Sequence, residues 1–159
     1  MKPIANKTMK ITICGSAKFI ERMKEVRGEL ESLGHEVKLP PLEIENEAGE
    51  MIPVTEYYAL RHAEADAEPA DDSWIWKRKG EEIHKHFAKI EWADVVLVVN
   101  EEKNEIPGYI GANTLIEMGL AFHLGKKIYL IRQIPDISYK EEILAMVPDV
   151  LHGDPSLIC

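Results

Sequence analysis

Short apolar runs alternate along the chain with longer segments in which apolar residues recur every three or four positions. The short runs are rich in β-branched residues and are bounded by glycine, proline or polar residues, which is typical of strands. They span 9–14, 35–39, 95–99, 127–132 and 150–151. The longer segments have the period of helices with one buried face. They span 19–33, 54–67, 74–92, 114–124 and 139–146.

This alternation predicts an α/β fold, because strands separated by helices form parallel sheets. The run 95–99 contains no polar residue, as expected for a central strand that helices cover on both faces. We therefore expect a three-layer flavodoxin-like (Rossmann-like) arrangement with five parallel strands in the order 2-1-3-4-5. Ligands of such sheets bind where the strand order reverses, which here is the crevice at the carboxyl ends of the first and third strands.

The length of 159 residues fits one domain, 1–159, which can bury a core without help from disulfides or a metal. One segment, 43–72, departs from the alternating pattern and carries ten acidic residues and one base, Arg61. The formal charge of the whole chain is −9, so all of the excess negative charge belongs to this segment. We interpret it as an acidic insertion that follows the second strand.

Composition and charge exclude several classes of protein. Lys and Arg total 19 against 28 Asp and Glu, which argues against a nucleic-acid partner, because that binding needs cations to neutralise phosphates. No apolar stretch is long enough to cross a membrane, and the N-terminus lacks the apolar core of a signal peptide, so we expect a cytoplasmic protein. Cys14 and Cys159 are too few and too far apart for a disulfide framework or a zinc site, so we expect no metal and no cofactor.

Glu117 is the first candidate for catalysis. The pattern places it in the first turn of the helix that follows the third strand, at the expected crevice. Between apolar walls, a carboxylate can attack a carbon atom or stabilise developing positive charge. The alternative is structural, because Thr114 and Glu117 have the spacing of a capping box, in which the glutamate satisfies the start of a helix.

The turn after the first strand is a second candidate. Gly15, Ser16 and Lys18 offer backbone N–H groups, a hydroxyl and an ammonium, which could hold a phosphate or a sugar hydroxyl, although a plain turn fits equally well. Nearby aromatic residues could stack on a planar base or simply fill the core. They are Tyr57, Tyr58, Trp74, Trp76 and Tyr109.

His86 is a third candidate. It lies three residues after Ile83 and four before Ile90, so it should face the sheet, near the carboxyl end of the third strand. An inward histidine is either a packed, hydrogen-bonded residue or an acid–base group, and the spacing does not choose between them.

Three stretches give the chain a resemblance to a known family. They are Ile13-Cys14-Gly15-Ser16, then Ala93-Asp94-Val95-Val96-Leu97-Val98, and finally Ile116-Glu117-Met118-Gly119-Leu120-Ala121 followed by Gly125-Lys126-Lys127. Together they resemble the nucleoside 2-deoxyribosyltransferase superfamily, which includes the 2'-deoxynucleoside 5'-phosphate N-hydrolases. The resemblance implies a subunit that forms a homodimer or a larger homo-oligomer. It also implies that Glu117 attacks the anomeric carbon of a deoxynucleoside, while Ser16 and Lys18 contact the 5' end of the substrate.

The chain departs from the family at three positions. His86 stands where members usually carry an aspartate that protonates or holds the base, and a histidine can act as an acid near neutral pH. Gly111 stands where the transferases have an aspartate, and Asn113 stands where the phosphate hydrolases tend to have glycine. The loop 108–113 therefore indicates a subfamily with its own substrate.

We expect cleavage or transfer at the N-glycosidic bond of a (deoxy)nucleoside or nucleoside monophosphate, a small-molecule partner, with Glu117 and His86 as catalytic residues. Seven residues are expected to bind the substrate, namely Cys14, Gly15, Ser16, Lys18, Tyr109, Gly111 and Asn113. The acidic segment is expected to form a mobile cover that repels polyanions and so disfavours triphosphates. Two alternatives are a non-catalytic nucleotide-binding protein on the same fold, and an interaction module whose acidic segment binds a basic partner.

Overall fold

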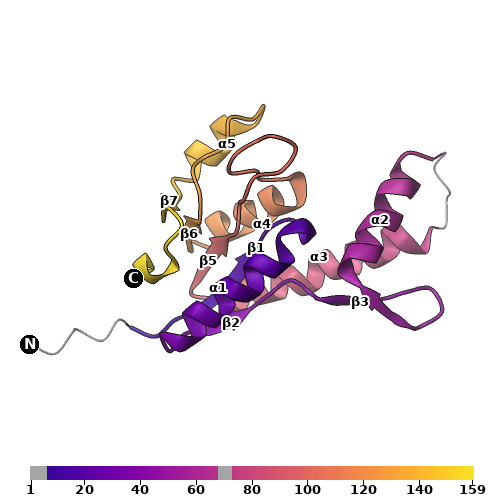
Figure 1. Cartoon of the computed structure of the whole chain (residues 1–159), viewed down its shortest axis with the longest axis horizontal. Helices are drawn as coiled ribbons and strands as arrows, with labels where there is room; N and C mark the ends of the chain where they lie inside the picture. Colours follow the sequence, from indigo (N-terminus) through magenta and orange to yellow (C-terminus); the bar gives the residue numbers. More distant parts are fainter. Residues whose placement is uncertain (1–6, 68–72) are drawn as a thin grey trace, which may run out of the picture.

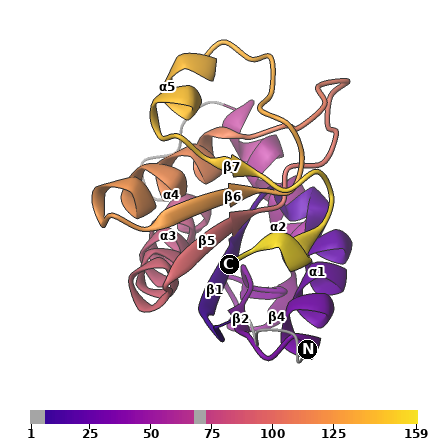
Figure 2. The same cartoon turned by 90° about the vertical axis from the view of Figure 1, so that its left-hand side faces the viewer.

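The computed structural model describes residues 7–67 and 73–159 and contains a five-stranded parallel sheet (Figure 1). The strands are β1 (Lys10–Cys14), β2 (Glu36–Lys38), β5 (Val95–Val98), β6 (Lys127–Leu130) and β7 (Asp149–Val150). They lie in the order β2-β1-β5-β6-β7, and every neighbouring pair is parallel (Figure 2). Counted along the chain within this sheet, the order is 2-1-3-4-5, so the predicted topology is confirmed.

Helices on both faces of the sheet complete the three layers. α1 (Ile20–Ser32) covers one face, where the short 3-10 helix η2 (Pro155–Leu157) packs beside it. α3 (Trp74–Trp92), α4 (Ala112–His123) and α5 (Lys140–Ala145) cover the other face. The flavodoxin-like α/β architecture expected from the sequence is therefore present.

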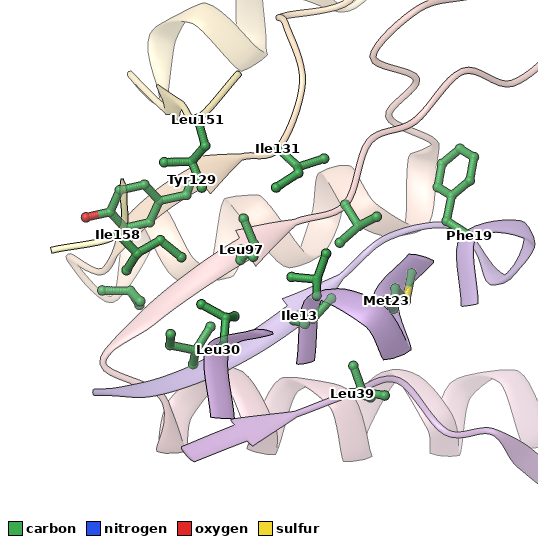
Figure 3. Close-up of a cluster of buried hydrophobic side chains, with 14 of the residues drawn as sticks. Ile13, Phe19, Met23, Leu30, Leu39, Leu97, Tyr129, Ile131, Leu151 and Ile158 are labelled. Atoms are coloured by element: carbon green, nitrogen blue, oxygen red, sulfur yellow. The ribbon is translucent and has the colours of Figure 1, made fainter. Parts of the chain in front are cut away.

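Successive strand residues point into two separate apolar clusters. Ile13 and Leu97 point towards α1, where Leu30 packs in the same cluster (Figure 3). Their neighbours Cys14 and Val96 point to the opposite face, towards α3 and α4. Because both faces of the central strands are buried, these strands need apolar residues at almost every position, as the sequence shows.

The helices that border the crevice begin differently from the sequence prediction. A short 3-10 helix, η1 (Ala17–Phe19), precedes α1, and Ser16 caps it by accepting a hydrogen bond from the backbone N–H of Lys18. α4 begins at Ala112, with Gly111 as its N-cap, rather than at 114.

The acidic segment, residues 43–72, contains more structure than the one helix predicted there. Its described part forms an antiparallel hairpin of β3 (Glu43–Glu45) and β4 (Met51–Pro53), which leads into α2 (Val54–Ala65). In Figure 1 this part extends to the right, away from β6 and β7. The acidic residues Glu68, Asp71 and Asp72 lie outside the described residues.

The described part of this segment has a small core of its own. Ile44 of β3, Tyr57 of α2 and Ile75 of α3 are buried together, apart from the two clusters that cover the sheet. The Tyr57 hydroxyl donates a hydrogen bond of 2.6 Å to the carbonyl oxygen of Ile75. This packing attaches the segment to the first turn of α3. The mobility expected for the segment stays a prediction.

Within the described residues, no helix combines the length and the apolar character that a membrane span requires. Cys14 and Cys159 are both free. Cys159 is exposed, whereas Cys14 is buried at the end of β1, close to the crevice.

Replacing Tyr57 by Phe should lower the free energy of unfolding by about 1 kcal/mol, because a buried hydrogen bond is lost while the ring keeps its packing. Urea denaturation of both proteins measures the difference. The exposed neighbour on α2 provides the control, since Glu56→Gln should change stability by less than about 0.5 kcal/mol. Equal stability of Tyr57→Phe and the parent protein would contradict the importance of this contact.

Candidate active site

The Glu117 carboxyl group is buried on the second turn of α4. Because α4 begins at Ala112, Glu117 is too far along the helix to satisfy its N-terminus, and the predictions of a capping box and of a first-turn position are wrong. The residue is 5% exposed. Its Oε1 atom accepts a hydrogen bond of 2.7 Å from Asn113 Nδ2, one turn earlier on the same helix. The carboxyl group is therefore held behind the crevice by side-chain contacts.

Side chains from two other elements meet Glu117. Cys14 ends β1, and His86 comes from the inward face of α3, as its spacing predicts. His86 Nε2 lies 3.4 Å from Glu117 Oε2 and 3.4 Å from Cys14 Sγ. The fold thus brings a thiol, an imidazole and a carboxyl group together in one buried place.

Burial controls the protonation of these three groups. It raises the pKa of Glu117 to about 7, although hydrogen bonds from Cys14 and Asn113 and the charge of Lys79 oppose the shift. Burial lowers the pKa of His86 to about 3, so the imidazole is neutral at pH 7. Burial also raises the pKa of Cys14 well above its ordinary value, and the charge of Glu117 adds to this shift. A neutral thiol and a neutral imidazole therefore surround a carboxyl group that changes charge near pH 7.

Lys79 of α3 reaches Glu117 through Asn113. Its Nζ atom donates a hydrogen bond of 2.9 Å to Asn113 Oδ1, and the amide nitrogen of Asn113 donates to Glu117. Burial lowers the pKa of Lys79 to about 8, so the ammonium form still predominates at pH 7. The chain from Lys79 through Asn113 orients the Glu117 carboxylate and favours its ionised form.

Cys14, His86 and Glu117 also form a candidate ligand set for a metal ion within the described residues, because their donor atoms lie within 4.8 Å of one another. A zinc ion would need the thiolate and the carboxylate. Burial favours the protonated forms of both Cys14 and Glu117, and the ammonium of Lys79 adds positive charge nearby. The set therefore fits an internal hydrogen-bonded network better than a cation.

A crevice with two lobes opens beyond the carboxyl ends of β1 and β5. We call the first the apolar lobe, although the polar side chains of Glu82 and His86 also line it. Its apolar wall consists of Ile20, Pro40, Pro41, Ile44, Val54, Tyr57 and Ile83. Both lobes share Gly15, Ala17, Arg61, Lys79 and Asn113. We call these shared residues the waist. Because Asn113 is one of them and donates a hydrogen bond to Glu117, the carboxyl group lies behind the waist, although it lines neither lobe.

The second lobe, the cationic lobe, is polar. Arg61, Lys79 and Lys103 bring three positive side chains to it, and no carboxylate of the described chain lines it. Besides the shared residues it is lined by Ser16, Tyr58, His62, Lys103, Tyr109, Gly111, Ala112 and Thr114. The acidic residues of 43–67 line neither lobe, whereas Arg61 lines both. Other residues of 43–67, among them Ile44 and Val54, do border the crevice, so the segment lies beside it as expected, while the repulsion of polyanions expected of it stays a prediction.

Most of the expected substrate-binding residues line the crevice. They are Gly15, Ser16, Tyr109, Gly111 and Asn113. Cys14 is fully buried behind the wall, and Lys18 is exposed and lines neither lobe. Gly15 is required by close packing, since a Cβ atom there would lie 2.7 Å from the carbonyl oxygen of Val99.

Four charged residues of the crevice were not named as candidate site residues from the sequence. Lys79 and Glu82 precede His86 on α3 at helical spacing, so the stripe that predicts an inward His86 also contains them. Arg61 carried a weaker signal, as the one base of the acidic segment. Lys103 carried none, because its position depends on the path of the loop after β5.

Comparison with known proteins identifies no family for this chain. No family model matches the sequence, and no curated protein matches it. Among solved structures, the chain is similar to a 2-deoxyribosyltransferase from the psychrotolerant bacterium Bacillus psychrosaccharolyticus, with 19% identity and a TM-score of 0.43. The match covers 76% of this chain and 70% of that chain. A likeness of this size assigns neither a family nor a substrate, so the function is argued from the site.

Replacing Glu117 by Gln should make the protein more stable at alkaline pH. The folded-state pKa of Glu117 lies above its ordinary value of 4.5, so the parent protein loses stability as pH rises from about 4.5 through 7, and glutamine does not. The advantage of the variant should reach about 3 kcal/mol above pH 7. Unfolding free energies measured from pH 4.5 to 8.5 test this, with the exposed Glu91→Gln as the control. A difference that is independent of pH would contradict the buried, raised pKa.

Proposed function

We propose that this protein cleaves or transfers at the N-glycosidic bond of a (deoxy)nucleoside or nucleoside phosphate, with Glu117 as the nucleophile. The observation that carries the proposal is the position of this carboxyl group behind the waist between an apolar and a cationic lobe. A nucleoside has the same division, with a flat apolar base at one end and a polar 5' end at the other. The sugar then lies at the waist, next to Glu117.

The apolar lobe has the chemistry to hold the base. Pro40 and Pro41 are partly exposed and offer apolar surfaces against which a planar ring system can pack. Glu82 is the one carboxylate among the described residues that line this lobe, and it can accept hydrogen bonds from an amino group of the base. This placement leaves the 5' end of the nucleoside directed towards the cationic lobe.

Cleavage begins when an ionised Glu117 oxygen attacks the anomeric carbon. The bond from that carbon to the base nitrogen breaks, the nitrogen takes up a proton from solvent, and an ester joins the sugar to Glu117. Water then attacks the anomeric carbon and releases the sugar, and its second proton returns to solvent. Attack by a second base in place of water gives transfer. In both cases the Glu117 carboxylate is regenerated.

The neighbours of Glu117 support the oxocarbenium-like transition state in different ways. Asn113 donates a hydrogen bond that fixes one carboxylate oxygen, and Lys79 keeps the amide of Asn113 in place. Neutral His86, in the tautomer that carries its proton on Nε2, donates that N–H towards the other oxygen. Because its pKa is about 3, His86 acts here as a positioning residue rather than as the acid expected near neutral pH.

A second candidate function is ligand binding without cleavage. One observation favours it, since Glu117 is 5% exposed and, with a pKa of about 7, is only half ionised at neutral pH. A protein of this kind would bind a nucleoside or nucleotide in the two lobes and leave it unchanged.

Replacing Glu117 by Gln should reduce release of free base at least about a thousandfold, because the neutral amide is a poor nucleophile. Chromatography of reactions with deoxynucleosides and their 5'-phosphates measures the loss, and mass spectrometry of the parent protein should detect the glycosyl ester on Glu117. The control Glu91→Gln, on the exposed side of α3, should keep full activity. Base release by Glu117→Gln at the parent rate would refute the proposal. Ligands that raise Tm but stay intact would establish the second candidate instead.

Replacing Asn113 by Ala should shift the acid limb of the kcat profile to higher pH by about one unit. The reason is that Asn113 donates a hydrogen bond which favours the ionised carboxylate, so its loss raises the Glu117 pKa above about 7. Rates measured between pH 5.5 and 9 show the limb directly. A variant that loses activity equally at every pH would contradict a role in the ionisation of Glu117.

A further inference from the structure

Two positive side chains of the cationic lobe, those of Arg61 and Lys103, form no ion pair with a carboxylate of the described residues. Lys103 Nζ donates a hydrogen bond of 2.8 Å to the Tyr58 hydroxyl and one of 3.2 Å to Ser16 Oγ. It also lies 4.9 Å from the centre of the Tyr109 ring. These contacts fix the ammonium group between α2, the turn after β1 and the loop after β5, but none of them neutralises its charge.

A tight turn presents Lys103 at this point. Lys103 and Ile106 pair across a two-residue turn, and the backbone N–H of each donates a hydrogen bond to the carbonyl oxygen of the other. The two residues of the turn, Asn104 and Glu105, have positive φ angles of 52° and 62°. The turn is therefore a defined structure. This turn places the Lys103 ammonium group at the cationic lobe.

Arg61 enters the lobe from α2 and is also without an acidic partner among the described residues. Its guanidinium lies 5.5 Å from the ring centre of Tyr57 and 5.2 Å from that of Tyr58. Its Nε atom is buried and has no hydrogen-bond partner in the described chain. Burial disfavours the positive charge of Arg61 and lowers its pKa. A bound anion would supply the missing partner.

The beginning of α4 adds to the positive potential. Gly111, Ala112 and Thr114 line the same lobe, and no side chain caps this helix. The N–H groups of its first turn have no acceptors within the helix, so they favour negative charge at this end.

We infer that the cationic lobe is a subsite for the pyrophosphate group of a nucleoside 5'-diphosphate. This inference rests on the proposed function, which places the 5' end of the nucleoside in this lobe. Arg61, Lys79 and Lys103 supply three positive charges. The charge of Lys79 is already shared with the ionised Glu117 through Asn113. Arg61 and Lys103, which enter the lobe from α2 and from the loop after β5, are therefore the cations that remain for a ligand. A phosphate monoester carries about two negative charges at pH 7 on a single group, whereas two phosphoryl groups can each meet one of these cations. A second phosphoryl group adds about one charge and can bridge Arg61 and Lys103.

The proposed subsite differs from the electrostatic effect that the sequence predicts for the acidic segment, which is repulsion of polyanions. None of the segment's acidic residues in the described chain lines the crevice, whereas its one base, Arg61, lines both lobes. In the proposed subsite Arg61 attracts a diphosphate at short range, although the segment as a whole is acidic.

Inorganic pyrophosphate and inorganic phosphate test the subsite without a base or a cleavable bond. Titration calorimetry on the parent protein should show that pyrophosphate binds at least about tenfold more tightly than phosphate. Arg61→Gln and Lys103→Met, each made in the parent protein, should each weaken pyrophosphate binding at least about tenfold and reduce its salt dependence. Melting temperatures of all variants confirm that each protein is folded.

Lys77→Gln is the matched control, because Lys77 is an exposed lysine of α3 outside both lobes. It should leave pyrophosphate affinity unchanged. Pyrophosphate that binds no more tightly than phosphate would overturn the inference, as would an equal loss of affinity in Lys77→Gln and Arg61→Gln. Neither result touches the proposed function, which stands or falls on release of base from nucleosides and nucleotides by the parent protein. Conversely, tight pyrophosphate binding by a protein that releases no base would retain the subsite and reject the glycosidic chemistry.

Discussion

Burial of a carboxyl group at the switch point between β1 and β5 is the constraint on which the arrangement of the crevice depends. Removing Glu117 from water disfavours its charge, and the surrounding side chains reduce that penalty in complementary ways. Asn113 and Lys79 favour the ionised form, while Cys14 and His86 remain neutral and add no repulsion. The result is a poorly hydrated carboxyl group that still changes its charge near neutral pH.

The parts of the molecule that follow from local periodicity could be predicted from the sequence. The unbroken apolar run of β5 identifies a central strand, and the spacing of His86 from Ile83 and Ile90 identifies its inward face. The hairpin of β3 and β4 could not be predicted, because its strands are three residues long and depend on burial of Ile44 beneath α2. The start of α4 at Ala112 was also missed, since a helix N-terminus without a capping side chain has little local signature.

Net charge was a poor guide to the electrostatics of the crevice. The whole-chain value of −9 describes exposed acidic residues that water and salt screen over about 8–10 Å. The half-buried Arg61 and Lys103 act at short range in a partly desolvated space, where their fields are much stronger. Which charge a ligand meets is therefore decided by the orientation of a few side chains on α2 and on the loop after β5. Composition does not contain that information.

The small core around Tyr57 has a consequence for substitutions in the apolar wall. Ile44, Val54 and Tyr57 form part of the apolar wall, yet they pack with Ile75 in a cluster separate from those that hold the sheet together. Substitutions that reshape this wall would accordingly weaken a peripheral unit and leave the central scaffold intact. The wall of the apolar lobe can thus change its residues at little cost to the scaffold that carries Glu117 and its neighbours.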